Sequence, residues 1–113
     1  MTKTSYIACY TPIRNPKLRL FCFHHAGGGA STYRHWSSYM AEIDVEVVPI
    51  QLPGRENRIA EPCITDISLL LSEMMEGLGS FLDRPFALWG HSMGAMLAFE
   101  FAARLHQMRG PEP

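Results

Sequence analysis

Short apolar runs typical of buried β-strands alternate along this chain with stretches whose apolar residues recur at helical spacing. The runs cover residues 18–23, 45–52 and 85–89, and turn residues follow each of them. Such a chain folds into a parallel sheet, because helical crossovers connect successive strands and cover the sheet's faces. The sequence therefore predicts an α/β protein with a mainly parallel sheet, and functional groups are expected at the carboxyl ends of the strands.

The three helical segments differ in length. The first, around Trp36, is short, and Ser31 or Thr32 is its expected capping residue. The second, residues 65–82, carries apolar residues at i, i+3, i+4 and i+7, a stripe that needs a sheet to cover it. The third, residues 93–105, is rich in strong helix formers. The predicted order is strand, helix, strand, helix, strand, helix.

Composition and charge limit the class of protein. The chain has 113 residues, 47% apolar and 19% charged, which fits one globular domain or part of one. With 10 Lys and Arg against 11 Asp and Glu, it has no basic excess for binding nucleic acid or a membrane surface. Residues 1–17 contain prolines and predict an irregular or edge segment. The start leads into no signal-peptide core, and no stretch is apolar enough to span a membrane.

Three cysteines, Cys9, Cys22 and Cys63, form no C-x-x-C pair. An odd number of cysteines without paired spacing favours free thiols. The sequence therefore predicts a protein of the reducing cytoplasm.

The stretch Gly90-His91-Ser92-Met93-Gly94 matches G-x-S-x-G and lies between a predicted strand and a predicted helix. A nucleophilic serine on such a turn needs glycine on either side, because Cβ atoms there would collide with the strand and the helix. The start of the helix also offers the Met93 amide to a developing oxyanion. The alternative is a chance match, which the position of the motif disfavours. His91 is expected to pack at the turn rather than to act as the base.

A glycine-rich loop, residues 24–31, follows the first strand, where hydrolases of this architecture supply their second oxyanion donor. It can also be a flexible connection, but a phosphate-binding loop would need a Lys-Ser/Thr ending that is missing. A metal site built from Cys22, His24, His25 and His35 matches no recognised spacing. Neither a metal nor another cofactor is predicted.

Three blocks of sequence carry a family resemblance: residues 20–28 (LFCFHHAGG), 51–56 (QLPGRE) and 90–95 (GHSMGA). Together, in this order and spacing, they resemble the type II thioesterases that accompany polyketide and nonribosomal peptide synthetases. The resemblance implies an α/β-hydrolase fold and hydrolysis of acyl groups from the phosphopantetheine arm of acyl or peptidyl carrier proteins. It assigns Ser92 as the nucleophile and the backbone amides of Ala26 and Met93 as the oxyanion hole.

The chain departs from that family in two respects. His24 stands where the family usually has proline. Family members also have a helical lid, an Asp and a His after the serine, whereas this chain offers only Glu100, His106 and Glu112 there. Glu100 and His106 belong to the helix that starts at the serine turn or follow it directly, so neither is expected to fold back onto Ser92.

Residues 1–113 are therefore expected to be the N-terminal portion of a single thioesterase domain, with an incomplete sheet and no activity alone. Self-association through an exposed sheet edge is expected. Two alternatives stay open: a non-catalytic fragment, and a serine esterase or lipase acting on free esters.

Two further patterns have structural interpretations. The charged residues 55–58 can line the mouth of a site where a carrier protein docks, but a solvated turn is the preferred interpretation. Met74 and Met75 belong to the stripe of the second helix and are expected in the core rather than in a substrate groove.

Overall fold

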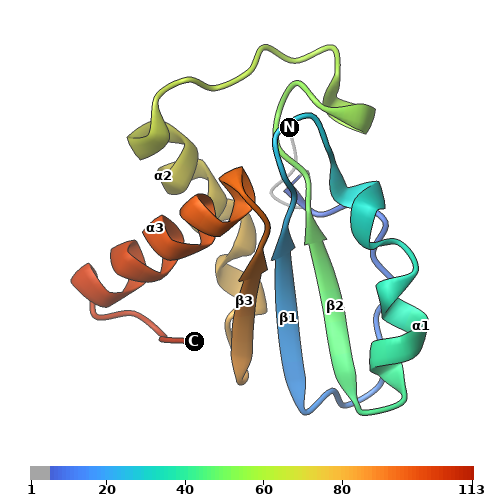
Figure 1. Cartoon of the computed structure of the whole chain (residues 1–113). Coiled ribbons are helices and arrows are strands. Elements are labelled where there is room, and N and C mark those ends of the chain that lie inside the picture. The colour runs from blue at the N-terminus through green and yellow to red at the C-terminus, as the bar shows by residue number, and fades with distance from the viewer. Residues whose placement is uncertain (1–5) are drawn as a thin grey trace.

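The computed structural model describes residues 6–113. The expectation that the start of the chain leads into no signal-peptide core therefore lies largely outside the described residues. Three strands, β1 (Leu18–Phe23), β2 (Val45–Ile50) and β3 (Phe86–Gly90), form one parallel sheet in the order β2-β1-β3 (Figure 1). The predicted parallel α/β architecture is confirmed. The second strand ends at Ile50, before the predicted residue 52, because its ladder partner β1 ends at Phe23, opposite Ile50.

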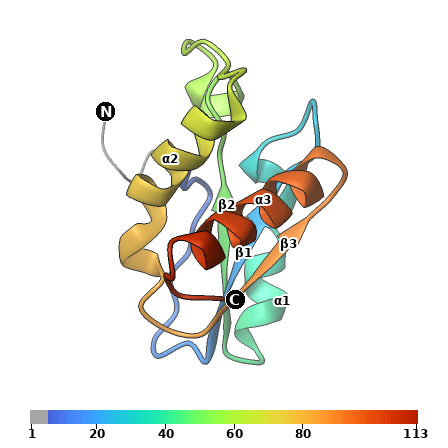
Figure 2. The same ribbon diagram turned by 90° about the vertical axis from the view of Figure 1, so that its left-hand side faces the viewer.

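Helices cover both faces of this sheet (Figures 1 and 2). Helix α1 (Trp36–Ala41) lies on one face, and α2 (Ile67–Leu78) and α3 (Met93–Gln107) pack on the other. No helix in the described part of the chain is both long and apolar enough to cross a bilayer. The larger core, between the sheet and the helix pair, includes the buried residues Phe21, Phe23, Val48, Ile50, Leu70, Leu71, Met74, Leu78, Leu97, Phe101 and Leu105.

The predicted caps of the first helix are wrong. Ser31 and Thr32 belong to a separate 3₁₀ turn, Ala30–Tyr33, and α1 begins after His35 without a side-chain cap. The capping position of α1 is His35, so Ser31 and Thr32 lie too far upstream to cap it, and Ser31 bonds to Glu56 instead. In α2, by contrast, the side chain of Asp66 accepts hydrogen bonds from the first free amides of the helix, as a capping residue does.

Residues before β1 run along the β2 edge of the sheet. Ile7 forms an antiparallel bridge with Ile50, which confirms the predicted edge segment. Tyr6 is buried; its hydroxyl donates to Glu73 of α2 at 3.0 Å, and the Arg58 guanidinium lies 4.4 Å from its ring centre. The segment before β1 therefore contacts both β2 and α2.

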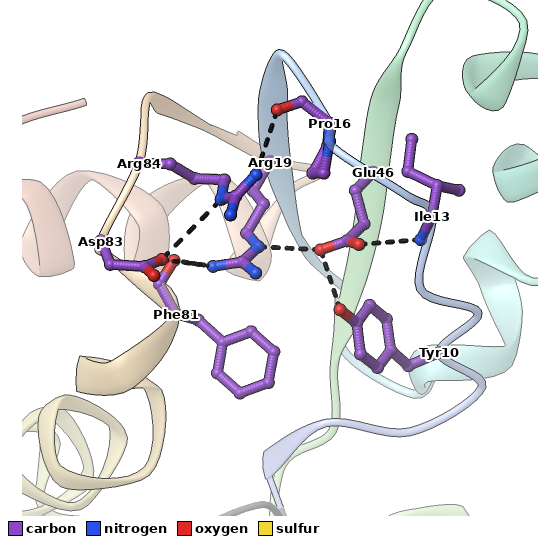
Figure 3. A network of polar contacts seen from close by, with 8 residues as sticks. All are labelled: Tyr10, Ile13, Pro16, Arg19, Glu46, Phe81, Asp83 and Arg84. Carbon is purple, nitrogen blue, oxygen red and sulfur yellow. Dashed lines mark hydrogen bonds and ion pairs between the residues drawn. The ribbon is translucent and has the colours of Figure 1, made fainter.

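A polar network closes the amino end of the sheet (Figure 3). Glu46 of β2 is 2% exposed and accepts hydrogen bonds from Arg19 Nε at 2.8 Å, Tyr10 Oη at 2.8 Å and Ile13 N at 2.9 Å. Burial opposes the charge of Glu46, but these three donors outweigh it and lower the pKa of its carboxyl group. Arg19 also pairs with Asp83 at 2.7 Å, so the network ties the segments before β1 and β3 to the sheet.

Candidate active site

Ser92 lies in the tight turn between the end of β3 and the start of α3. Its φ is 57° and its ψ is −115°, a conformation that L residues rarely adopt. A Cβ on Gly90 would lie 2.2 Å from Gly94 O, and a Cβ on Gly94 would lie 2.0 Å from Phe23 O. Both contacts are far inside van der Waals distance, which is the physical reason for glycine on either side of Ser92. The turn thus exposes a serine side chain at the carboxyl edge of the sheet.

The loop of residues 24–29 begins where β1 ends, beside this turn. His91 N donates to Phe23 O at 3.4 Å. The serine turn therefore lies beside Phe23, the residue at which β1 ends and the loop begins. Gly28 N donates to His25 O at 3.0 Å, and Gly27 has a φ of 82°, which closes the loop into a turn of its own.

The amides of Ala26 and Met93 have no hydrogen-bond partner within residues 6–113. Ala26 lies in the loop, and Met93 is the first residue of α3, whose N–H points away from the helix. Both amides thus lie near the carboxyl edge of the sheet without an internal acceptor.

Three histidines lie close to Ser92 in the fold. His24 is 1% exposed, its Nδ1 lies 2.9 Å from His25 O, and its Nε2 has no partner within the described residues. Burial lowers the pKa of His24, so its imidazole is neutral at pH 7. The rings of His25 and His91 meet edge to face, with centres 5.5 Å apart. Within the described chain, no hydrogen bond joins Ser92 to a histidine.

The downstream candidates lie far from Ser92. His106 is close to the end of the 15-residue helix α3, where its Nδ1 is 3.1 Å from Glu112 Oε1. A rise of about 1.5 Å per residue separates His106 from the start of α3 by about 20 Å. His106 and Glu112 are therefore not within reach of the serine hydroxyl.

A cavity of about 230 Å³ opens next to the serine turn. Its walls are mostly apolar and come from α2, α3 and the segment between β2 and α2. Met93, the residue after Ser92, contributes to this wall, so the cavity borders the serine turn. The sequence pattern did not predict the cavity, because residues 59–66 have no regular structure. The lining residues are Leu52, Pro53, Arg55, Cys63, Ile64, Thr65, Ile67, Leu70, Met93, Met96 and Leu97.

The charged residues 55–58 are not a uniformly solvated turn. Arg58 is 3% exposed and pairs with Glu61 at 2.7 Å, so the preferred interpretation is wrong for this residue. Arg55 lines the cavity, which fits the alternative that the segment borders a site. Met74 lies in the core, as expected. No three potential metal ligands cluster among residues 6–113.

A parallel sheet between helices, with a strained serine turn at its carboxyl edge, defines an α/β-hydrolase fold. A family model described as "Thioesterase domain" matches residues 18–113, and the chain belongs to this family. Linear gramicidin dehydrogenase LgrE of Brevibacillus parabrevis is 48% identical over 94 residues, which cover 83% of this chain and 35% of LgrE. Gramicidin S biosynthesis protein GrsT of Aneurinibacillus migulanus is 44% identical over 97 residues, which cover 86% of this chain and 38% of GrsT.

Among solved structures, the type II thioesterase BorB from the borrelidin biosynthetic cluster superimposes with a TM-score of 0.83 and 38% identity. The match covers 92% of this chain and 42% of BorB. The chain thus spans between 35% and 42% of the length of these three proteins.

Proposed function

We propose that this chain is the N-terminal portion of a single serine thioesterase domain that removes acyl groups from the phosphopantetheine arm of acyl or peptidyl carrier proteins. One observation carries the proposal: an exposed serine with a φ of 57° begins a helix beside two amides without internal partners. The relatives support it, because one is a thioesterase of a biosynthetic cluster and another serves gramicidin S biosynthesis.

In the proposed reaction, Ser92 Oγ attacks the thioester carbonyl carbon as a base takes its proton. The carbonyl oxygen becomes an oxyanion, and the amides of Ala26 and Met93 donate hydrogen bonds to it. The carbon–sulfur bond then breaks, the pantetheine thiol leaves with a proton, and an ester on Ser92 remains. Water attacks this ester, which releases the acid and restores the serine hydroxyl. Within residues 6–113, no histidine forms a hydrogen bond with Ser92. The proposal therefore assigns the base to a part of the domain that this chain does not include.

The cavity beside Met93 is the proposed site of the acyl group. Its mostly apolar lining fits an acyl chain, and its position next to the turn fits a chain attached to Ser92. A cytoplasmic location agrees with the three free cysteines, because thiols stay reduced there.

Two other activities fit less well. The name of LgrE describes a dehydrogenase, but this chain has no G-x-G-x-x-G dinucleotide fingerprint. A thiol nucleophile at Cys22 is disfavoured, because burial raises the pKa of this thiol to about 12. An esterase acting on free esters would use the same serine, so substrates must separate it from a thioesterase. An acyl-pantetheine should be hydrolysed in preference to the matching acyl ester.

The test joins residues 1–113 to the remaining part of GrsT and measures hydrolysis of an acyl-pantetheine. Ser92→Ala should abolish turnover, whereas Ser80→Ala, at an exposed serine without a polar contact to residues 6–113, should leave it unchanged. Retention of most of the activity in Ser92→Ala would mean that the serine turn is not the catalytic site.

A further inference from the structure

Two side chains from the segment after β2 hold the loop of residues 24–29 in place. Gln51 is fully buried, and its Oε1 accepts a hydrogen bond from Ala30 N at 3.0 Å. Glu56 accepts hydrogen bonds from Ser31 N at 3.1 Å and from the Ser31 hydroxyl, one through each carboxylate oxygen. The two successive amides that follow the loop are therefore both bound by this segment.

The contact between Glu56 and the loop depends on glycine. A Cβ on Gly29 would lie 2.3 Å from Glu56 Cδ, so no other residue fits at this position without displacing the carboxylate. Glu56 itself has a φ of 43°, in the left-handed region that L residues avoid. A residue stays in such a conformation where its surroundings enforce it. The bonds of its carboxylate to Ser31 and the bond of Ile59 N to its carbonyl at 3.0 Å surround Glu56 here.

Gln51 is in turn fixed by its own neighbours. Its Nε2 donates to Arg55 O at 3.3 Å, its backbone N donates to Tyr6 O at 2.8 Å, and its carbonyl accepts from Arg58 Nη1 at 3.4 Å. Tyr6 and Arg58 are themselves buried. Gln51 thus rests on the packed core, whereas Glu56 is exposed and holds the loop from the solvent side.

We propose that Gln51 and Glu56 are positioning residues that hold the Ala26 amide where it can share an oxyanion with the Met93 amide, an inference that rests on the function proposed above. The start of the loop is fixed by β1, against which the serine turn is pressed through Gly94. Its end is fixed by Gln51 and Glu56. Fixing both ends sets how far the loop reaches toward the serine turn. Neither side chain touches the reacting atoms, so both act through the loop.

Steady-state kinetics of the chain joined to the remaining part of GrsT test this role. Glu56→Ala should lower kcat by about 10²-fold, the effect of misplacing a catalytic donor by about 1 Å, and leave KM nearly unchanged. Glu56→Gln keeps an oxygen acceptor for Ser31 N and should restore most of kcat. Glu76→Ala, at an exposed glutamate of α2 without a polar contact, is the matched control and should behave like the wild type.

A readout independent of activity is amide hydrogen exchange in the 113-residue chain. Glu56→Ala should speed exchange at Ser31, and Glu56→Gln should not. If Glu56→Ala fails to fold, Glu56→Asp replaces it, because the shorter acid keeps the charge and loses the reach to Ser31.

The two proposals fail in different ways. Activity that survives Ser92→Ala overturns the catalytic function itself. Activity that is lost in Ser92→Ala but stays within about twofold of wild type in Glu56→Ala and Glu56→Asp overturns the positioning role alone. A loss of kcat that Glu56→Gln does not restore also overturns it, because the negative charge rather than the bond to Ser31 would then matter.

Discussion

Gly94 fixes the distance between the serine turn and the end of β1, so its replacement tests the site at the scale of one residue. A Cβ at this position would lie 2.0 Å from Phe23 O, a backbone atom that cannot rotate away. We expect Gly94→Ala to destabilise the fold by about 1–3 kcal/mol, the usual cost of overpacking a buried site. Urea unfolding measures this, with Gly79→Ala as control, because a Cβ there meets no atom within 4 Å. Equal stability of the two variants would contradict the close approach.

Sequence predicted the serine turn better than the contacts around it. G-x-S-x-G predicted the strained turn at Ser92 because the geometry of that turn demands its two glycines. Ala26 was assigned through the family resemblance and stays a prediction. The parts played by Gln51 and Glu56 were not predicted, because their partners, Ala30 and Ser31, lie 21 and 25 residues away along the chain. Such long-range bonds leave no local pattern in one sequence.

At the scale of elements, the Arg19–Glu46 pair connects the strands β1 and β2 at the amino end of the sheet. The folded-state pKa of Glu46 is lowered, so its stabilising contribution is complete above the unfolded-state value of about 4.5 and is lost as the pH falls through the folded-state value. At neutral pH, Glu46→Gln should lower the free energy of unfolding by about 1–3 kcal/mol, because it removes the charged acceptor of three hydrogen bonds while Arg19 keeps its pair with Asp83.

Urea unfolding between pH 7 and about pH 3.5 measures both effects. The wild type should lose more stability over this range than Glu46→Gln, and Glu76→Gln should follow the wild type. Parallel pH profiles for wild type and Glu46→Gln would show that Glu46 is not a paired carboxylate in the folded state.

Elements with a regular pattern were predicted closely, and irregular ones were not. The strand β1 has the predicted bounds, and α2 follows the predicted stripe. The start of α1 differed, because Ser31 and Thr32 belong to a separate 3₁₀ turn that ends before α1 begins. The cavity wall between β2 and α2 was missed because its residues pack through tertiary contacts and have neither strand nor helix periodicity.

At the scale of the whole molecule, the proposed mechanism places two oxyanion donors but no base within residues 6–113. Removing one member of a triad that acts as a unit reduces kcat by on the order of 10⁶-fold. We expect the purified 113-residue chain to hydrolyse an acyl-pantetheine at least that much more slowly than the same residues joined to the rest of GrsT. Turnover of the 113-residue chain at about 1 s⁻¹, within the range of ordinary enzymes, would contradict the assignment of the base.

The sheet of this chain has one unprotected edge, and we expect molecules to associate through it. Within residues 6–113, β3 pairs only with β1, and its sequence FALWG carries no charge to deter pairing with another strand. Beside it, Met96 is 54% and Phe99 70% exposed. Sedimentation at micromolar concentration should therefore detect dimers or larger species. Phe99→Glu should reduce the amount of these species. Tyr39→Glu, at a 74% exposed residue of α1, is the control and should not change it. Co-expression with the remaining part of GrsT should yield a soluble complex with thioesterase activity. A monodisperse, cooperatively unfolding monomer of the wild-type chain would show that β3 and α3 need no further cover.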